Sequence, residues 1–312
     1  MSFFSKLQRE SQEERRVAYR QRLFYGINYT RQSLENKAII RRKNCFENMP
    51  IVLPEYKFID FSPKQHDYAV CIPVFNEGER IRRQLEEMQK IHIQDVADIF
   101  ICDGGSTDNC THPDLMKKLG VNLLIERISP GHMSDQLMLC YYFAVTREYK
   151  YCITIDGNGK DSVDGIFTFI EALKEGYDLI QGSRYLPSGA SINTPKYRDL
   201  AIRLLHVPVI NKLSGFRYTD TTNGFRAHNT KLFEDPRINP FRYGIFPTYA
   251  LIHYLTVRAP RSGYRITEVP VTRKYPFRGK IPSKVSFLKG NLDLLKILWN
   301  LKSNKYDPPG TK

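Results

Sequence analysis

Asp156 and Asn158 are the residues best placed for chemistry in this chain. They directly follow the apolar run Tyr151–Ile155, and glycines stand at positions 157 and 159. Open α/β sheets present polar groups in this way at their carboxyl edge, where ligands bind. Asp156 and Asn158 could therefore face a divalent cation, or the phosphates that such a cation bridges. A solvated Asx turn is the plainer alternative for this turn taken alone.

Three further polar turns follow apolar runs in the same manner. They are Phe75–Gly78, Asp103–Asp108 and Gly182–Tyr185. The second of these offers backbone N–H groups, a hydroxyl and two carboxylates at the entrance to a helix, which suits nucleotide contacts.

A basic segment lies farther along the chain. Arg273–Lys280, with Ser283 and Lys284 close behind, collects cations beside Gly and Pro. This composition suits a mobile loop that closes over phosphates. A solvated basic loop is the alternative.

The elements that must position these turns alternate along the chain. Five apolar runs predict strands, and the stretches between them have the apolar spacing of helices. The predicted strands are 68–74, 98–102, 121–125, 151–155 and 178–181, and the predicted helices are 79–91, 133–147 and 163–174. This alternation predicts an α/β fold with a Rossmann-like, mostly parallel sheet flanked by helices.

Beyond Tyr185 the pattern loosens. We expect helices at 200–213, 247–258 and 287–301 and a strand at 265–272. Pro208 is expected to kink or break the first of these helices.

Length and composition place the chain among globular proteins. Its 312 residues can bury the core of one large domain or two modest ones. Its 41% apolar and 26% charged residues are ordinary for a soluble protein. No run approaches the roughly 20 apolar residues of a membrane-spanning helix, and a secretory signal is lacking. The six cysteines show no CxxC spacing and three lie in predicted buried strands, so we expect a cytoplasmic location.

The net charge of +14 suits nucleic acid, an anionic membrane surface or phosphate-rich substrates. The basic residues are spread along the chain, without a compact Lys/Arg tract or an aromatic-studded basic strand of the RNA-binding type. We therefore rank nucleic acid last and expect no nucleic-acid partner.

Two terminal segments are expected to flank the main domain. Residues 1–65 are predicted to form a basic helical arm that packs on the main domain or a second subunit. Peripheral attachment to an anionic membrane is the less favoured alternative. Residues 286–312 are predicted to form an amphipathic helix and tail, which hold the only tryptophan, Trp299, between Lys296 and Lys302. This helix could cover the core or lie on lipid.

Five motifs together resemble a known enzyme family. They are Ile72–Glu77, Cys102–Asp108, Ile155–Asn158, Gly182–Tyr185 and Asp220–Arg226. In order and spacing they are similar to the motifs of family 2 inverting glycosyltransferases with the GT-A fold. The nearest likeness is to the dolichol- or polyprenyl-phosphate mannose synthase branch. Residues Arg273–Lys284 also resemble the closing segment of that branch. The similarity implies a GT-A domain over residues 66–285.

The resemblance implies which residues bind the donor. Nucleobase and ribose contacts would come from the turns after the first two strands, with Asp103 hydrogen-bonding the base. The residues concerned are Pro73, Phe75, Glu77, Asp103 and Ser106. Asp156 and Asn158 would hold Mg²⁺ or Mn²⁺ on the donor diphosphate, which must be stabilised as it leaves.

The resemblance also implies acceptor and phosphate contacts. Asp220 stands at the position of the family's acidic residue on the acceptor side. For an alcohol acceptor this residue would be the general base, whereas a phosphate acceptor is already anionic and needs no base. The groups that would grip phosphates are Arg184, Arg226, Arg273, Ser283 and Lys284. We expect Asp156, Asp220 and Arg273 to be catalytic.

Three positions depart from the family pattern. Gly104 replaces a second Asp in the turn that contacts base or ribose, and Asn158 replaces the second Asp of the metal motif. Lys160 lies where relatives tend to offer a neutral metal ligand. A site with one carboxylate fewer and one cation more should bind metal more weakly. Our hypothesis is that Lys160 partly stands in for the metal.

These features predict an inverting glycosyltransferase that moves a sugar from a UDP- or GDP-sugar to a polyprenyl-phosphate or cell-surface glycan acceptor. We expect it in the cytoplasm or at the inner face of the membrane. A sugar-phosphate nucleotidyltransferase would need a Gly-rich basic loop after the first strand, where Phe75–Gly78 is instead acidic. A non-enzymatic module that binds phosphoglycan or nucleic acid rests on charge alone. The sugar, the base, the acceptor and a homo-oligomeric state stay open.

Overall fold

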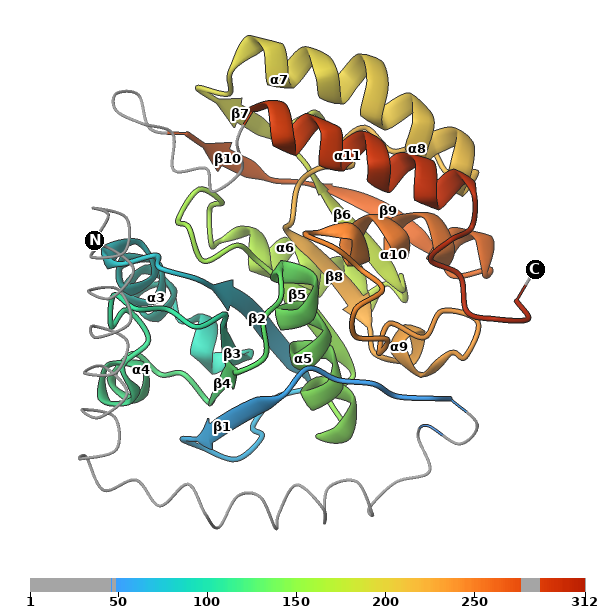
Figure 1. Cartoon of the computed structure of the whole chain (residues 1–312). Coiled ribbons are helices and arrows are strands. Elements are labelled where there is room, and N and C mark those ends of the chain that lie inside the picture. Colours follow the sequence, from blue (N-terminus) through green and yellow to red (C-terminus); the bar gives the residue numbers. More distant parts are fainter. Residues whose placement is uncertain (1–45, 47–48, 276–286, 312) are drawn as a thin grey trace, which may run out of the picture.

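The computed structural model describes residues 46, 49–275 and 287–311 (Figure 1). The predicted arm up to residue 45 therefore lies outside the described residues. So does most of the predicted phosphate-closing loop, including Ser283 and Lys284.

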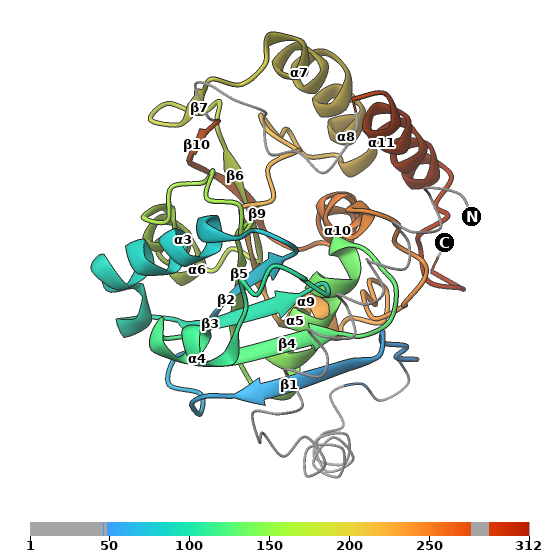
Figure 2. The same cartoon turned by 60° about the vertical axis from the view of Figure 1, so that its left-hand side comes forward.

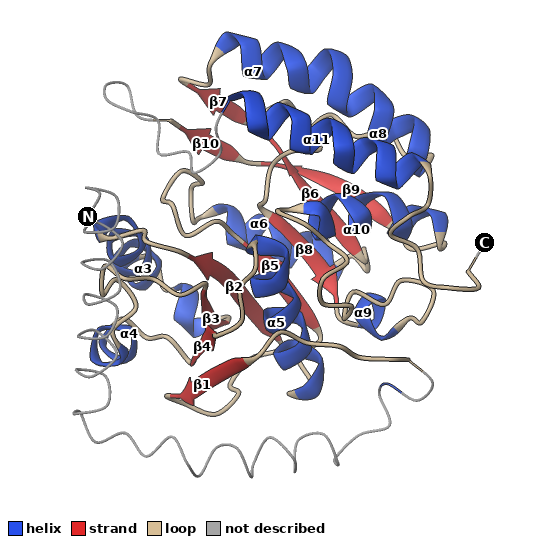
Figure 3. Cartoon of the chain, viewed as in Figure 1, coloured by secondary structure: helices blue, strands red, loops and turns tan. Residues whose placement is uncertain are grey.

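The centre of the molecule is an eight-stranded sheet, drawn in red in Figure 3. In spatial order its strands are β1 (Tyr56–Asp60), β4 (Leu123–Arg127), β3 (Asp98–Asp103), β2 (Tyr68–Val74), β5 (Tyr151–Thr154), β8 (Arg226–Asn229), β6 (Leu179–Ser183) and β9 (Ile266–Pro270). From β4 to β5 the neighbouring strands are parallel, as are β6 and β9. The five predicted strands and the mostly parallel sheet are confirmed, with small shifts at the strand ends.

Two strands run antiparallel to their neighbours, and the sequence pattern missed both. β1 pairs with β4 at the edge of the sheet, so the predicted arm boundary at residue 65 is wrong for residues 56–60. β8 has the sequence Arg-Ala-His-Asn, which lacks the apolar alternation of a strand. It lies between β5 and β6, and its first three residues are buried.

Helices cover both faces of the sheet because successive strand residues point to opposite sides. On β2, Ala69 and Cys71 face the core that α5 (Met133–Thr146) and α10 (Ala250–Arg261) complete. Val70, Ile72 and Val74 face the core that α3 (Glu79–Lys90) and α6 (Gly165–Lys174) complete. The shorter helices are η2 (Ile93–Asp95), α4 (Pro113–Lys118) and α9 (Lys231–Glu234). Because both faces are covered, the polar turns at the strand ends are where the sheet can offer its functional groups.

A smaller group of elements lies at the top of Figures 1 and 2. β7 (Ala190–Ile192) pairs in parallel with β10 (Thr272–Lys274), which completes the predicted strand 265–272 after a break at Val271. α7 (Lys196–Ala201), the π-helical turn η3 (Ile202–His206) and α8 (Val207–Ser214) follow one another without interruption. Pro208 has no N–H to donate to the preceding turn, and the helix widens there instead of breaking.

The C-terminal helix α11 (Phe287–Lys302) packs against α8 and α10. Its residues Ile297, Leu298 and Leu301 join the core beside α10. One side of the predicted amphipathic helix therefore covers the core. Within the described part of the chain, no helix combines the length and apolar character that crossing a bilayer requires.

Candidate active site

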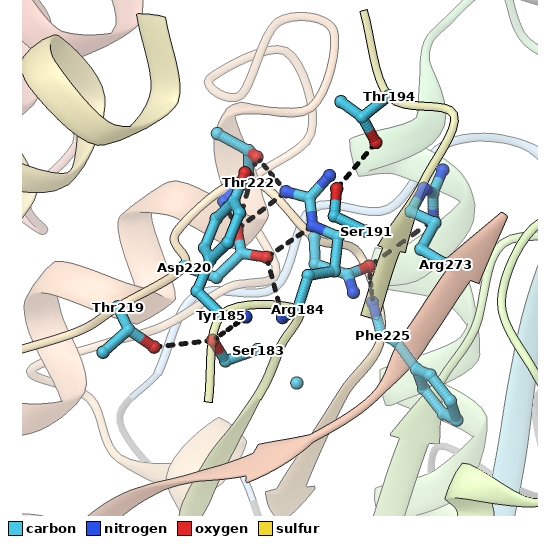
Figure 4. A network of polar contacts seen from close by, with 12 residues as sticks. Ser183, Arg184, Tyr185, Ser191, Thr194, Thr219, Asp220, Thr222, Phe225 and Arg273 are labelled. Atoms are coloured by element: carbon cyan, nitrogen blue, oxygen red, sulfur yellow. Dashed lines mark hydrogen bonds and ion pairs between the residues drawn. The ribbon is translucent and has the colours of Figure 1, made fainter. Parts of the chain in front are cut away.

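The predicted motifs meet at one edge of the sheet because β2, β3, β5 and β6 point their carboxyl ends the same way. Phe75–Gly78 follows β2, Asp103–Asp108 closes β3, Asp156–Lys160 follows β5 and Arg184 follows β6. Figure 4 shows the part of this edge around Arg184, Asp220 and Arg273.

Asp103 organises its own turn. Its Oδ1 accepts hydrogen bonds from the N–H groups of Gly105 (3.0 Å) and Ser106 (2.7 Å), and its Oδ2 accepts one from the Thr111 hydroxyl (2.5 Å). The side chain is also buried. Both carboxylate oxygens are thus engaged, so the prediction that Asp103 hydrogen-bonds a base is not supported by this geometry.

Hydrogen bonds join the turns after β2 and β3. The Asn76 N–H donates to Ser106 Oγ at 2.9 Å, and the Thr107 N–H donates back to Asn76 Oδ1 at 2.7 Å. These bonds hold the β2 turn in place, where the Phe75 ring is 42% exposed. Pro73 is half-buried below it, and Glu77 pairs with Arg80 at 2.7 Å. The turn thus presents an aromatic face and a polar wall, and its predicted contact with base and ribose stays a prediction.

Arg273 lies between two carboxylates of the turn after β5. Its Nη2 donates to Asp156 Oδ2 at 2.8 Å, and its Nη1 pairs with Asp161 Oδ2. Backbone bonds fix this position: the N–H of Ser162 donates to the Thr272 carbonyl and that of Lys274 to the Lys160 carbonyl. Asp156 and Arg273, two of the three residues predicted to be catalytic, are therefore brought together by β10.

Burial and Arg273 act in opposite directions on these carboxylates. Burial by itself would raise the pKa of Asp156, but the charge and hydrogen bond of Arg273 outweigh it, so that the pKa is lowered. At Asp161 burial prevails and raises the pKa to about 6. The sequence reading missed Asp161; the available signal was a second carboxylate five residues after Asp156 in the same polar turn.

Lys160 adds a second cation to this cluster. Its side chain is only 8% exposed, and its Nζ lies 5.2 Å from the centre of the Tyr275 ring. Burial, followed by repulsion from Arg273, lowers its pKa to about 8, although Asp156 acts in the other direction. Lys160 therefore carries positive charge close to Asp156 at neutral pH.

The metal ligands expected here, Asp156 and Asn158, offer one carboxylate and one amide oxygen. Asp156 Oδ2 already accepts from Arg273 and from the Asn158 amide at 3.2 Å, and Asn158 Oδ1 accepts from the Lys160 N–H. Within the described ranges, no three His, Cys, Asp or Glu side chains gather in a metal-binding group. This donor set fits a weakly held divalent cation, and not a tightly bound one.

Asp220 forms a buried ion pair with Arg184 (Figure 4). Arg184 Nε donates to Oδ2 at 2.6 Å and Nη2 donates to Oδ1 at 2.8 Å, while the Thr222 N–H also donates to Oδ1. Burial would raise the pKa of Asp220, but Arg184 more than offsets it and lowers the pKa. A fully buried carboxylate held in this way is poorly placed to act as a general base, so the general-base role of Asp220 stays a prediction that this ion pair does not favour.

Arg226 is also placed differently from the expectation. Its guanidinium is fully buried and donates to the carbonyl oxygens of Asn223, Ile252 and Thr221. Burial lowers its pKa to about 10. Arg226 thus supports the Asp220–Arg226 motif from inside the core, and the prediction that it grips a phosphate is wrong for this geometry.

A cleft of about 700 Å³ opens beside the turn after β5. One wall is a face of α3 with Arg80, Arg83, Gln84 and Glu87. The other wall is residues 158–164 with Lys274 and Tyr275. The sequence reading of α3 foresaw its apolar stripe and missed this polar wall.

Three curated relatives align with about two thirds of this chain. Polyprenol monophosphomannose synthase of Mycolicibacterium smegmatis is 24% identical over 212 residues, which are 65% of this chain and 76% of the relative. Undecaprenyl-phosphate mannosyltransferase of Micrococcus luteus is 23% identical over 208 residues, 64% of this chain and 81% of the relative. Dolichol-phosphate mannosyltransferase of Pyrococcus furiosus is 24% identical over 234 residues, which are 70% of this chain and 60% of the relative. No family model matches the chain.

The fold is similar to that of solved structures of glucosyl-3-phosphoglycerate synthase from Mycobacterium tuberculosis. Its complex with Mn²⁺ and UDP-glucose aligns with a TM-score of 0.54 at 17% identity, covering 78% of this chain and 80% of that chain. Its complex with Mg²⁺ and UDP aligns with a TM-score of 0.53 at 15% identity and the same coverage. This likeness establishes the fold.

Fold, site and relatives define the chain as a glycosyltransferase with the GT-A fold. Within that class its sequence is similar to enzymes of the dolichol- and polyprenyl-phosphate mannose synthase branch, which its five motifs resemble.

Proposed function

We propose that this glycosyltransferase moves a sugar from a nucleoside-diphosphate sugar to the phosphate of a polyprenyl phosphate. The names of the three relatives describe mannose transfer involving polyprenol, undecaprenyl phosphate and dolichol phosphate. The solved neighbour was crystallised with UDP-glucose. These names support the proposal.

The observation that carries the acceptor class is the pairing of the carboxylates at the sheet edge. Arg184 holds Asp220, and Arg273 holds both Asp156 and Asp161. A hydroxyl acceptor must lose a proton to a base, whereas a phosphate acceptor is already anionic. A site whose carboxylates are committed to arginines suits the phosphate.

The proposed step is a single displacement with inversion at the anomeric carbon. An acceptor phosphate oxygen forms a bond to that carbon while the bond from the carbon to the donor diphosphate breaks. The nucleoside diphosphate leaves with the electron pair, and no proton needs to move. The catalytic requirement is therefore stabilisation of negative charge on the leaving diphosphate.

Arg273 and Lys160 are the cations that we assign to this charge. Both are largely buried beside Asp156, so their fields are less screened than those of surface side chains. A divalent cation held by Asp156 and Asn158 would add positive charge to the diphosphate when bound. Because Arg273 and Lys160 already place positive charge there, we propose that transfer depends only partly on a divalent cation.

The exposed Phe75 ring is the proposed contact of the nucleobase. The turn is pre-ordered by its bonds to Ser106 and Thr107, which reduces the entropy lost on binding. A ring face and an ordered turn favour stacking, since every base has a π-face.

A thermal-shift screen tests the donor. UDP- and GDP-sugars, each with and without Mn²⁺, should include one that raises the melting temperature, because a ligand that binds only the folded state stabilises it. Phe75→Ala should reduce that shift, whereas Phe167→Ala, on the outer face of α6, should not. If no nucleotide sugar raises the melting temperature, the donor assignment is wrong.

A further inference from the structure

The helix α7–η3–α8 carries a row of exposed apolar side chains. Leu204 is 69% exposed, Leu200 58%, Tyr197 56% and Leu205 45%. Single exposed leucines are normal on protein surfaces, but a row of them on one helical element is not. The opposite side of the same helix supplies the buried Ile202, His206 and Ile210.

The neighbouring helix α11 has a matching exposed side. Leu292 is 66% exposed, Leu295 48% and Trp299 67%, and their spacing of three and four residues places them on one face. The core residues Ile297 and Leu298 lie on its other side. This helix is thus apolar on both sides, although the core needs only one.

The two helices form one surface, which we call the α7–α11 surface. α8 and α11 are in contact, and α7 continues into α8 (Figures 1 and 2). Exposed cations border the apolar rows: Lys196, Arg203 and Lys212 on the first helix, and Lys296 and Lys302 on the second. Asp199 is partly neutralised by Arg203 at 3.1 Å.

We propose that the α7–α11 surface docks on an anionic lipid bilayer. Leucine, tyrosine and tryptophan flanked by Lys and Arg are the side chains that helices use to lie in the lipid headgroup region. A bilayer also accounts for the positive border, since anionic lipids attract nearby Lys and Arg. A second copy of this chain would bring the same cations into mutual repulsion.

The position of the surface relative to the site supports this partner, and this step rests on the proposed function. α7 begins four residues after β7, and β7 pairs with β10, which carries Arg273. A lipid whose tail stays in a bilayer against α7 and α11 could present its phosphate to the adjoining sheet edge. A water-soluble acceptor would leave the exposure of these apolar rows unexplained.

Trp299 reports directly on the surface because it is the only tryptophan in the chain. In buffer, we expect its emission to be that of an exposed indole and to be readily quenched by acrylamide. Vesicles of phosphatidylglycerol and phosphatidylcholine should shift the emission to shorter wavelength and protect it from acrylamide. Vesicles of phosphatidylcholine alone should produce a weaker effect.

A double variant, Leu200→Ser with Leu204→Ser, tests the other helix. Vesicle binding measured by sedimentation should weaken on the order of tenfold or more, from the lost apolar burial. Phe167→Ser, which removes an exposed ring on α6, is the matched control and should bind as the unaltered chain does. All three proteins should melt at similar temperatures, since the replaced side chains are exposed.

Three results would overturn the proposal. The first is a Trp299 emission unaffected by anionic vesicles. The second is a double variant that binds them as well as the control. The third is a Trp299 already shielded in buffer, which would mean that a second copy or another segment covers the surface. Vesicle binding is measured without a donor, so its result does not depend on the proposed function. Binding to vesicles without glycosyl transfer would refute the proposed function but not the proposed membrane surface.

Discussion

Arg273 and Asp156 are joined by an ion pair of 2.8 Å that spans 117 residues of sequence. The same guanidinium pairs with Asp161, so one side chain holds both carboxylates of the turn after β5. β10 brings Arg273 to this turn through backbone bonds on both sides of it. A cation is therefore in place at the sheet edge before any donor arrives, which reduces the reorganisation that charge stabilisation requires.

The close approach of Gly224 to Asp156 gives the first prediction. A Cβ at position 224 would lie 2.7 Å from Asp156 Oδ1, so Gly224→Ala must displace the carboxylate or the backbone. We expect kcat/KM for transfer to fall by about 100-fold, the effect of a displacement near 1 Å. Gly244→Ala is the control: its φ of 86° adds a backbone strain that position 224 lacks, but an added Cβ meets nothing within 4 Å. Equal activity losses in the two variants would contradict this account.

The Asp220–Arg184 pair predicts a loss of stability. Asp220→Asn leaves a buried guanidinium without its counter-charge, which should cost about 3–5 kcal/mol in the free energy of unfolding. The double variant Arg184→Met with Asp220→Leu should recover much of that loss, because neither charge remains. Chemical denaturation measures both. An Asp220→Asn variant that keeps its stability but loses kcat would instead identify Asp220 as a general base.

The extent of prediction from sequence differed between scaffold and site. β2 has four buried apolar or small residues in a row, and such a run can be recognised without knowledge of its neighbours. β8 cannot, because Arg226, Ala227 and His228 become strand residues only through pairing with β5 and β6. Local pattern therefore predicted the parallel half of the sheet and missed the antiparallel insertion.

The site shows the same division. The motifs placed Asp156 and Arg273 at the same sheet edge, but they did not show that the two side chains form an ion pair. Spacing along the chain cannot show that the Arg226 side chain points into the core or that Arg184 forms an ion pair with Asp220. Both facts depend on side-chain direction and burial.

Metal dependence is predicted to be partial. Lys160 supplies positive charge near Asp156, so EDTA should leave a measurable fraction of transfer activity. Lys160→Gln removes that charge, and its activity should fall more steeply with EDTA than that of the unaltered enzyme. Lys174→Gln, an exposed lysine on α6, is the control. Complete loss of activity in EDTA, with full recovery in Mn²⁺, would refute the role of Lys160.

Lys160 also predicts a dependence on pH. With a pKa of about 8, it is charged below that pH and neutral above it. If its charge stabilises the leaving diphosphate, kcat should decline as pH rises through about 8. In Lys160→Arg the side chain stays charged, so the decline should disappear even if the rate is lower. A profile that is identical in the two proteins would assign the decline to another group.

Arg273 is expected to matter more than any other cation. Arg273→Met should lower kcat by about 100- to 1000-fold, the loss typical when one preorganised donor to a developing anion is removed. Arg237→Met, which removes the exposed partner of Asp235 far from the site in sequence, should change kcat little. Melting temperatures must be compared alongside, since Asp156 and Asp161 lose their counter-charge. A kcat within threefold of the unaltered enzyme would exclude Arg273 from charge stabilisation.

The most direct test of the account compares two acceptors that differ only in the phosphate. Using the donor that the thermal-shift screen selects, labelled sugar transfer is measured to a short polyprenyl phosphate and to the matching polyprenol. The account predicts an extractable labelled product with the phosphate and none with the alcohol, because the carboxylates of the site are held by Arg184 and Arg273. Transfer to the alcohol at an equal or greater rate would contradict it.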